Sequence, residues 1–135
     1  MVRLHRYCSV AALSVLTSCG IFYRIHHVDV GLRAGLTPAQ LAVIRDTSTA
    51  LKDEVDPSSV LTEPQRACLA YTDWMTRNIG VPHPIFESVR VLFDPQNIVE
   101  ITETVGCYNM VSRFLVALDV GDMADAPVPD APSSS

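Results

Sequence analysis

The chain has 135 residues, which is enough for one compact domain and too few for two of ordinary size. Hydrophobic residues make up 48% of it, a share that excludes disorder over most of its length. The formal net charge of −5 comes from scattered acids without a basic stripe, and such a surface repels phosphate backbones. We therefore expect a single globular domain that does not bind nucleic acid.

The N-terminal region allows two localisations. Residues 1–22 contain Arg3 and Arg6, then the apolar run Val10–Leu16 and small residues, which is the order found in a signal peptide. Leu16-Thr17-Ser18-Cys19 also resembles a bacterial lipoprotein cleavage box. Because the apolar run is too short to span a bilayer, we expect a cytoplasmic protein without a membrane partner. A signal or lipoprotein-like segment that ends near Cys19 is the alternative.

Helical periodicity governs the first half of the chain. Apolar spacing predicts a helix from about His5 to Leu16 and a second one from Cys19 to Leu32. Thr37-Pro38-Ala39-Gln40 has the pattern of a capping box, which predicts a third helix to about Leu51. The stretch Lys52–Ser59 is polar and aperiodic, so we expect a surface connection there.

The second half predicts three more helices. Thr62-Glu63-Pro64-Gln65 repeats the capping pattern and begins a helix that ends near Gly80, and a short helix from Ile85 to Leu92 follows. The last helix, from Pro95 to about Val120, has apolar residues around much of its circumference, so we expect it to be central and largely buried. No segment shows sustained period-two alternation, and the predicted fold class is all-α.

The chain ends in a segment of Ala, Pro, Asp and Ser that lacks large apolar residues after Val128. Such a composition cannot bury enough surface to stay ordered. We expect a helical domain over residues 1–123 and a disordered tail over residues 124–135.

The predicted chemical centre lies near the N-terminus. Cys19, Tyr23, His26 and His27 stand at i, i+4, i+7 and i+8, so a helix would bring them to one face. A thiol, a phenol and two imidazoles on one face could carry acid–base or nucleophilic chemistry. The alternative is that the histidines are helix-packing residues with satisfied hydrogen bonds.

A polar break interrupts the last predicted helix at Tyr108, Asn109, Ser112 and Arg113. Buried polar groups need partners, so these residues are candidates for a pocket lining that binds substrate. Arg113 could hold a substrate carboxylate, or it could cross a subunit boundary to pair with an acid such as Glu100 or Glu103.

The cysteines are spread along the chain without a CxxC pair, at Cys8, Cys19, Cys68 and Cys107. Structural zinc takes its ligands as closely spaced pairs, and secreted disulfide scaffolds are denser in cysteine, so we expect reduced thiols and no metal. Cys68 and Cys107 lie on apolar helical faces, where small core residues are expected. His83 lies between two prolines and should be exposed.

Two sequence blocks carry a resemblance to a known family. The first runs from Leu16 through Val28 with Gly35-Leu36-Thr37 after it, and the second runs from Gln96 to Val120, most specifically Val105–Leu115. Together they resemble the carboxymuconolactone decarboxylase family and, by extension, the alkylhydroperoxidase D-like superfamily. The resemblance covers roughly residues 5 to 123. It implies an all-helical subunit of about six helices that assembles into dimers, trimers or hexamers, with a pocket lined by the histidine-bearing helix.

The resemblance also assigns family positions. In the redox branch, with its Glu and CxxCxxxH motif, Cys19 takes the first cysteine position and His26 the histidine position, while Phe22 stands where the second cysteine would be. In the decarboxylase-like branch the two expected glutamates fall on Tyr7 and Phe22. Neither a local two-thiol cycle nor an acidic partner for the histidines is therefore present at these positions. The residues before His26 also fit a shortened chain that lacks upstream helices.

Three functional hypotheses follow. The leading one is a decarboxylase-like enzyme without metal or organic cofactor that acts on a small carboxylated lactone or keto acid, as in fungal specialised-metabolite pathways. In it His26 supplies a proton, Tyr23 donates to the enolate and His27 orients His26 or binds the substrate. The second is a non-catalytic helical binding or assembly protein. The third is a thiol-dependent antioxidant protein that uses Cys19.

Overall fold

The computed structural model describes residues 2–18, 24–49 and 60–120. Its helices are α1 (Val2–Ser18), α2 (Arg24–Arg33), α3 (Pro38–Arg45), α4 (Glu63–Asn78), α5 (His83–Leu92) and α6 (Pro95–Ala117), with a 3-10 turn at Thr47–Thr49 after α3. The described ranges contain no strand. The predicted all-α class with six helices is confirmed.

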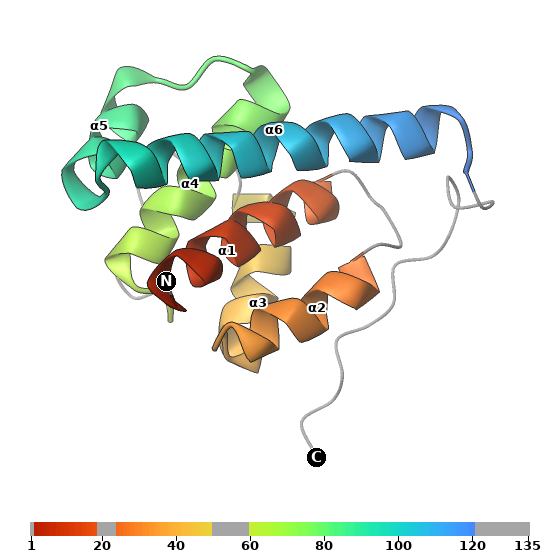
Figure 1. Ribbon diagram of the computed structural model, residues 1–135, viewed down its shortest axis with the longest axis horizontal. Helices are drawn as coiled ribbons and strands as arrows, with labels where there is room; N and C mark the ends of the chain where they lie inside the picture. The colour runs from red at the N-terminus through yellow and green to blue at the C-terminus, as the bar shows by residue number, and fades with distance from the viewer. Residues whose placement is uncertain (1, 19–23, 50–59, 121–135) are drawn as a thin grey trace.

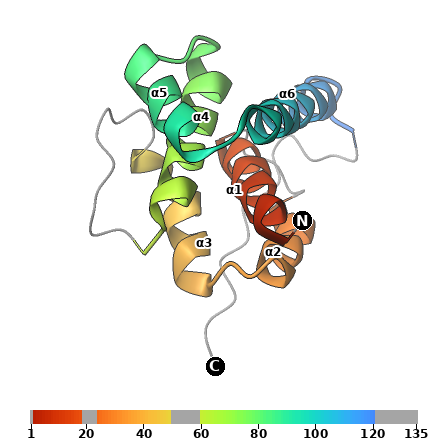
Figure 2. The ribbon, with the colours of Figure 1, turned by 60° about the vertical axis from the view of Figure 1, so that its left-hand side comes forward.

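Helix α1 is the centre of the arrangement, because α2, α3, α4 and α6 all pack against it. Figure 1 shows α6 along one side of α1 and α2 along the other. Figure 2 shows α4 beside α1, and α5 packs against α4. The central position of α1 follows from its sequence, since Val10, Ala11, Leu13 and Val15 are buried. Burying one of these valine or leucine side chains contributes about 1.5–3 kcal/mol.

Side-chain caps fix the starts of three helices. The Thr37 hydroxyl accepts from the Gln40 N–H at 3.2 Å, and the Thr37 N–H donates to Gln40 Oε1 at 3.0 Å. The Thr62 N–H likewise donates to Gln65 Oε1 at 2.8 Å. Both capping boxes are those predicted from the sequence. Asp94 caps α6 by accepting from the Asn97 N–H at 2.8 Å.

The third helix is shorter than predicted. It ends at Arg45 rather than near Leu51. Asp46 is the cause, because its carboxylate accepts from both the N–H (3.0 Å) and the hydroxyl (2.6 Å) of Ser48 and so favours a turn over another helical residue.

The prediction that the last helix is largely buried is wrong for one face of its C-terminal half. Ile101 and Val105 are in the core, whereas Phe114 and Leu118 are each 60% exposed and Val111 is also exposed. Figure 1 shows that α6 extends beyond the described end of α1, so α1 does not cover this exposed face. Cys107 is also exposed, which corrects its expected place in the core.

No helix among the described residues is long and apolar enough to span a membrane. The predicted tail from residue 124 onward lies outside the described residues.

Candidate functional site

The predicted N-terminal centre falls largely outside the described part of the chain. Cys19 and Tyr23 lie in the segment 19–23, which is not described, and His26 lies in α2 without a described side chain. Whether these three groups share one face with His27 therefore stays a prediction.

His27 and Tyr108, both predicted to bind substrate, are in contact although 81 residues separate them. The Tyr108 hydroxyl lies 3.3 Å from His27 Nδ1, and the tautomer of the ring decides which of the two donates. The two rings also meet edge to face, with centroids 5.0 Å apart. Because both side chains are half-buried, a phenol and an imidazole are held together at a position that solvent still reaches.

Burial raises the pKa of the Tyr108 phenol above its usual value, and the nearby Cys8 adds to this rise. The phenol therefore keeps its proton at neutral pH and is available as a hydrogen-bond donor. Cys8 lies half-buried on α1. The described residues thus gather a thiol, a phenol and an imidazole from α1, α6 and α2, although not the three that the sequence spacing suggested.

A buried carboxyl group lies between α1 and α4. Asp73 is 8% exposed, and its Oδ1 accepts from the Ser14 hydroxyl at 2.6 Å. Desolvation raises the pKa of Asp73, and the Ser14 hydrogen bond and the charge of Arg77 partly oppose this rise. Asp73 is therefore an acid in the core that local sequence spacing did not predict.

The polar break of α6 continues this buried polar layer. Asn109 Nδ2 donates to the Thr76 hydroxyl and to the Val105 carbonyl, both at 3.0 Å. Asn109 Oδ1 and the Ser112 hydroxyl are buried and have no hydrogen-bond partner among the described residues. A buried polar group without a hydrogen-bond partner costs about 1–3 kcal/mol. These two atoms are therefore able to form hydrogen bonds to a further polar group.

Arg113 has a structural contact within the subunit. Its Nη2 donates to the Thr76 carbonyl at 3.0 Å, which satisfies a carbonyl in the last turn of α4. The contact ties α6 to α4 without either of the acids considered as partners. One of those acids, Glu100, instead accepts from Gln96 at 2.8 Å on the same helix.

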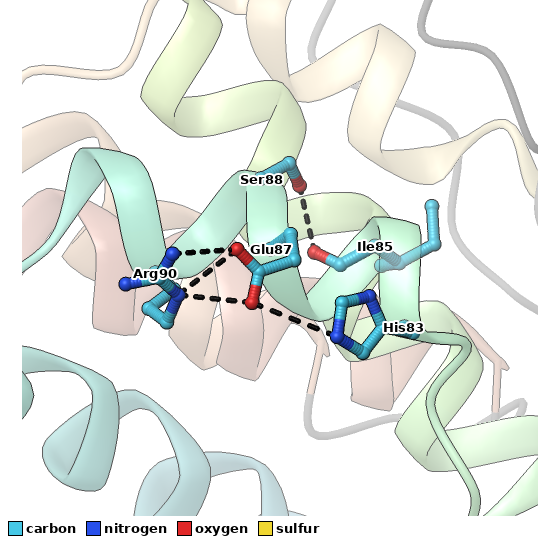
Figure 3. Close-up of polar contacts among 5 residues, drawn as sticks. All are labelled: His83, Ile85, Glu87, Ser88 and Arg90. Atoms are coloured by element: carbon cyan, nitrogen blue, oxygen red, sulfur yellow. Dashed lines mark hydrogen bonds and ion pairs between the residues drawn. The ribbon is translucent and has the colours of Figure 1, made fainter.

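A cluster of charged side chains lies on the surface of α5. Figure 3 shows Arg90 paired with the Glu87 carboxylate, with His83 on the far side of that carboxylate. The Arg90 hydrogen bonds hold the pKa of Glu87 below its usual value. His83 is exposed, as predicted, and the cluster is an ordinary helix-surface ion pair. Among the described residues no three ligating side chains are grouped to hold a metal ion.

Four residues with contacts in these clusters were missed from the sequence: Cys8, Ser14, Asp73 and Thr76. Ser14 and Asp73 occur inside predicted helices, where a polar residue on an apolar face is a signal of a buried polar contact. Their pairing across 59 positions could not be read from local spacing.

The arrangement of helices defines an alkylhydroperoxidase D-like fold, as the resemblance implied. A similar solved structure is a protein of unknown function from Agrobacterium tumefaciens that is described as a candidate antioxidant defence protein, AhpD. The two share 26% sequence identity and superpose with a TM-score of 0.67, over 96% of this chain and 80% of the other. No protein-family model and no curated protein matches the chain.

Proposed function

We propose that the protein is an acid–base enzyme that decarboxylates a small carboxylated lactone or keto acid without a cofactor. The contact between the Tyr108 hydroxyl and His27 Nδ1, at 3.3 Å, carries this proposal. Loss of carbon dioxide leaves an electron pair on the substrate as an enolate, which needs a hydrogen-bond donor and then a proton. The pKa of Tyr108 lies above its usual value, so the phenol stays protonated and supplies that donor.

His27 completes the relay in this proposal. When the phenol passes its proton to the substrate, the imidazole in contact with it returns one through Nδ1. The partial burial of both side chains strengthens the hydrogen bond to the enolate, because the effective dielectric constant is lower there than in bulk water. His26 and Tyr23, the proton donors predicted from the sequence, remain candidates for the same reaction.

Carbon dioxide release from a panel of carboxylated lactones and β-keto acids tests the proposal. For an accepted substrate, Tyr108→Phe should lower kcat by about 10²–10⁴-fold, the usual contribution of a general acid. Tyr7→Phe is the matched control, because the Tyr7 ring packs edge to face on Phe93 and is outside the pair. Release from no candidate acid, or full activity of Tyr108→Phe, would overturn the proposal.

A second candidate function is a thiol-dependent antioxidant reaction. The similar protein from Agrobacterium tumefaciens, described as a candidate antioxidant defence protein, supports it. So does the half-buried thiol of Cys8 beside the Tyr108 phenol. Consumption of hydrogen peroxide by the reduced protein tests this function, and a rate no greater than that of the thiol-blocked protein would exclude it.

We further propose that the protein works as a homo-oligomer. The C-terminal half of α6 presents an exposed apolar stripe of Met110, Val111, Phe114 and Leu118. Its members recur at helical spacing, and an apolar stripe on one helix face is suited to packing against a second copy. The resemblance to an oligomeric family supports the same assignment.

A further inference from the structure

Two cysteines from different helices lie close together where α1 packs on α4. Cys68 is fully buried in α4, and its sulfur donates to the carbonyl oxygen of Tyr7 at 3.4 Å. Tyr7 immediately precedes Cys8 in α1. Because a carbonyl oxygen lies about 3 Å from the Cα of the next residue, the Cys68 sulfur is within about 6 Å of the Cys8 Cα.

The two thiols also interact electrostatically. Burial raises the pKa of Cys68 to about 12, and the charge of Cys8 is the next largest contribution to that rise. Cys8 stands one helical turn before the buried Ala11 and Ala12, so its side chain is directed toward the packed side of α1. It is nevertheless half-buried rather than enclosed, and a small solute can reach it.

We propose that Cys8 and Cys68 form a redox-active dithiol that a hydroperoxide oxidises to an intramolecular disulfide. This inference rests on the second candidate function and supplies its chemistry. It replaces the local two-thiol motif that Phe22 interrupts with a pair drawn from two helices. A disulfide needs Cα atoms about 4.4–6.8 Å apart, so its formation would bring the Cα atoms of Cys8 and Cys68 into that range.

The reaction balances with the peroxide as the oxidant. The Cys8 sulfur attacks the terminal peroxide oxygen, so that an S–O bond forms, the O–O bond breaks and an alcohol or water leaves. Cys8 is then a sulfenic acid. The Cys68 sulfur attacks the Cys8 sulfur, the S–O bond breaks, and the hydroxide leaves as water with the Cys68 proton. Two thiols supply the two electrons that reduce the peroxide.

The environment of Cys68 sets the pace of the second step. Thiol exchange proceeds through the thiolate, and a pKa of about 12 leaves little thiolate at neutral pH. Ring closure should therefore accelerate as the pH rises above neutrality. The same burial protects Cys68 from direct attack by the peroxide, so Cys8 is the residue oxidised first.

The test treats the reduced full-length protein with hydrogen peroxide, follows peroxide consumption and maps cysteine-containing peptides by non-reducing mass spectrometry. The expected product is a Cys8–Cys68 linked peptide. It should persist in Cys107→Ser, a control that removes an exposed thiol, and be absent from Cys8→Ser. In Cys68→Ala, a sulfenic acid trap should label Cys8. The wild-type map stands by itself should Cys68→Ala fail to fold.

The outcomes separate the inference from the function on which it rests. Thiol-dependent peroxide consumption with a disulfide between other cysteines, or with Cys8 overoxidised beside a free Cys68, overturns the pair and leaves the antioxidant function standing. No peroxide consumption and no oxidised cysteine overturns both. A Cys8–Cys68 peptide whose yield rises with pH supports both.

Discussion

Replacing Ser14 by alanine removes the hydroxyl that donates to Asp73 across the α1–α4 interface, at 2.6 Å. Asp73 is only 8% exposed, so water cannot readily take the place of that hydroxyl. A hydrogen bond to a charged group contributes about 1.5–3 kcal/mol. For a domain of this length, 1 kcal/mol shifts Tm by about 3–5 °C, so Ser14→Ala should lower Tm by roughly 5–15 °C.

Thermal and urea unfolding at neutral pH measure this change. Ser88→Ala is the matched control, because the Ser88 hydroxyl donates within α5 to the Ile85 carbonyl at 2.7 Å and faces no buried charge. Its effect should stay within about 0.5 kcal/mol. Equal losses of stability in Ser14→Ala and Ser88→Ala would refute the argument that the hydroxyl of Ser14 stabilises the buried carboxyl group of Asp73.

Two further predictions concern charge and assembly. Burial raises the Asp73 pKa above its unfolded value, so the folded state holds the proton more tightly, and stability is greatest below the unfolded pKa and falls as pH rises through the folded one. Urea titrations across the acidic range measure the free energy of unfolding at each pH. In Asp73→Asn its fall with rising pH should be absent, and an unchanged pH profile would contradict the assignment of this fall to Asp73. Phe114→Glu should reduce the mass measured by light scattering to that of a smaller assembly, whereas Val91→Glu, at an exposed apolar position on α5, should leave it unchanged. Equal masses for Phe114→Glu and the unmodified protein would place the interface elsewhere.

Local signals in the sequence were sufficient for most of the fold. The capping boxes at Thr37 and Thr62 satisfy helix N-termini with residues three positions away, so they are readable from a short window. The extent of burial was not readable in the same way. Phe114 and Leu118 continue the apolar pattern of α6, but α1 ends too early to cover them, and helix lengths far apart in sequence decide this.

The candidate site was predictable only in part. Polar residues in an apolar helix pointed to Tyr108 and Asn109, and the histidine pair pointed to His27, because these patterns are local. Their partners were not, since His27 meets Tyr108 and Asn109 meets Thr76 only after α2, α4 and α6 have packed. Contacts across a helix interface depend on packing that local spacing does not encode.

A double-mutant cycle of Tyr108→Phe and His27→Gln in kcat/KM for an accepted acid tests the proposed proton relay most directly. If the phenol and the imidazole act as one unit, the double variant should lose no more activity than the more damaged single variant. Losses that simply multiply, or single variants as active as the unmodified protein, would contradict the relay.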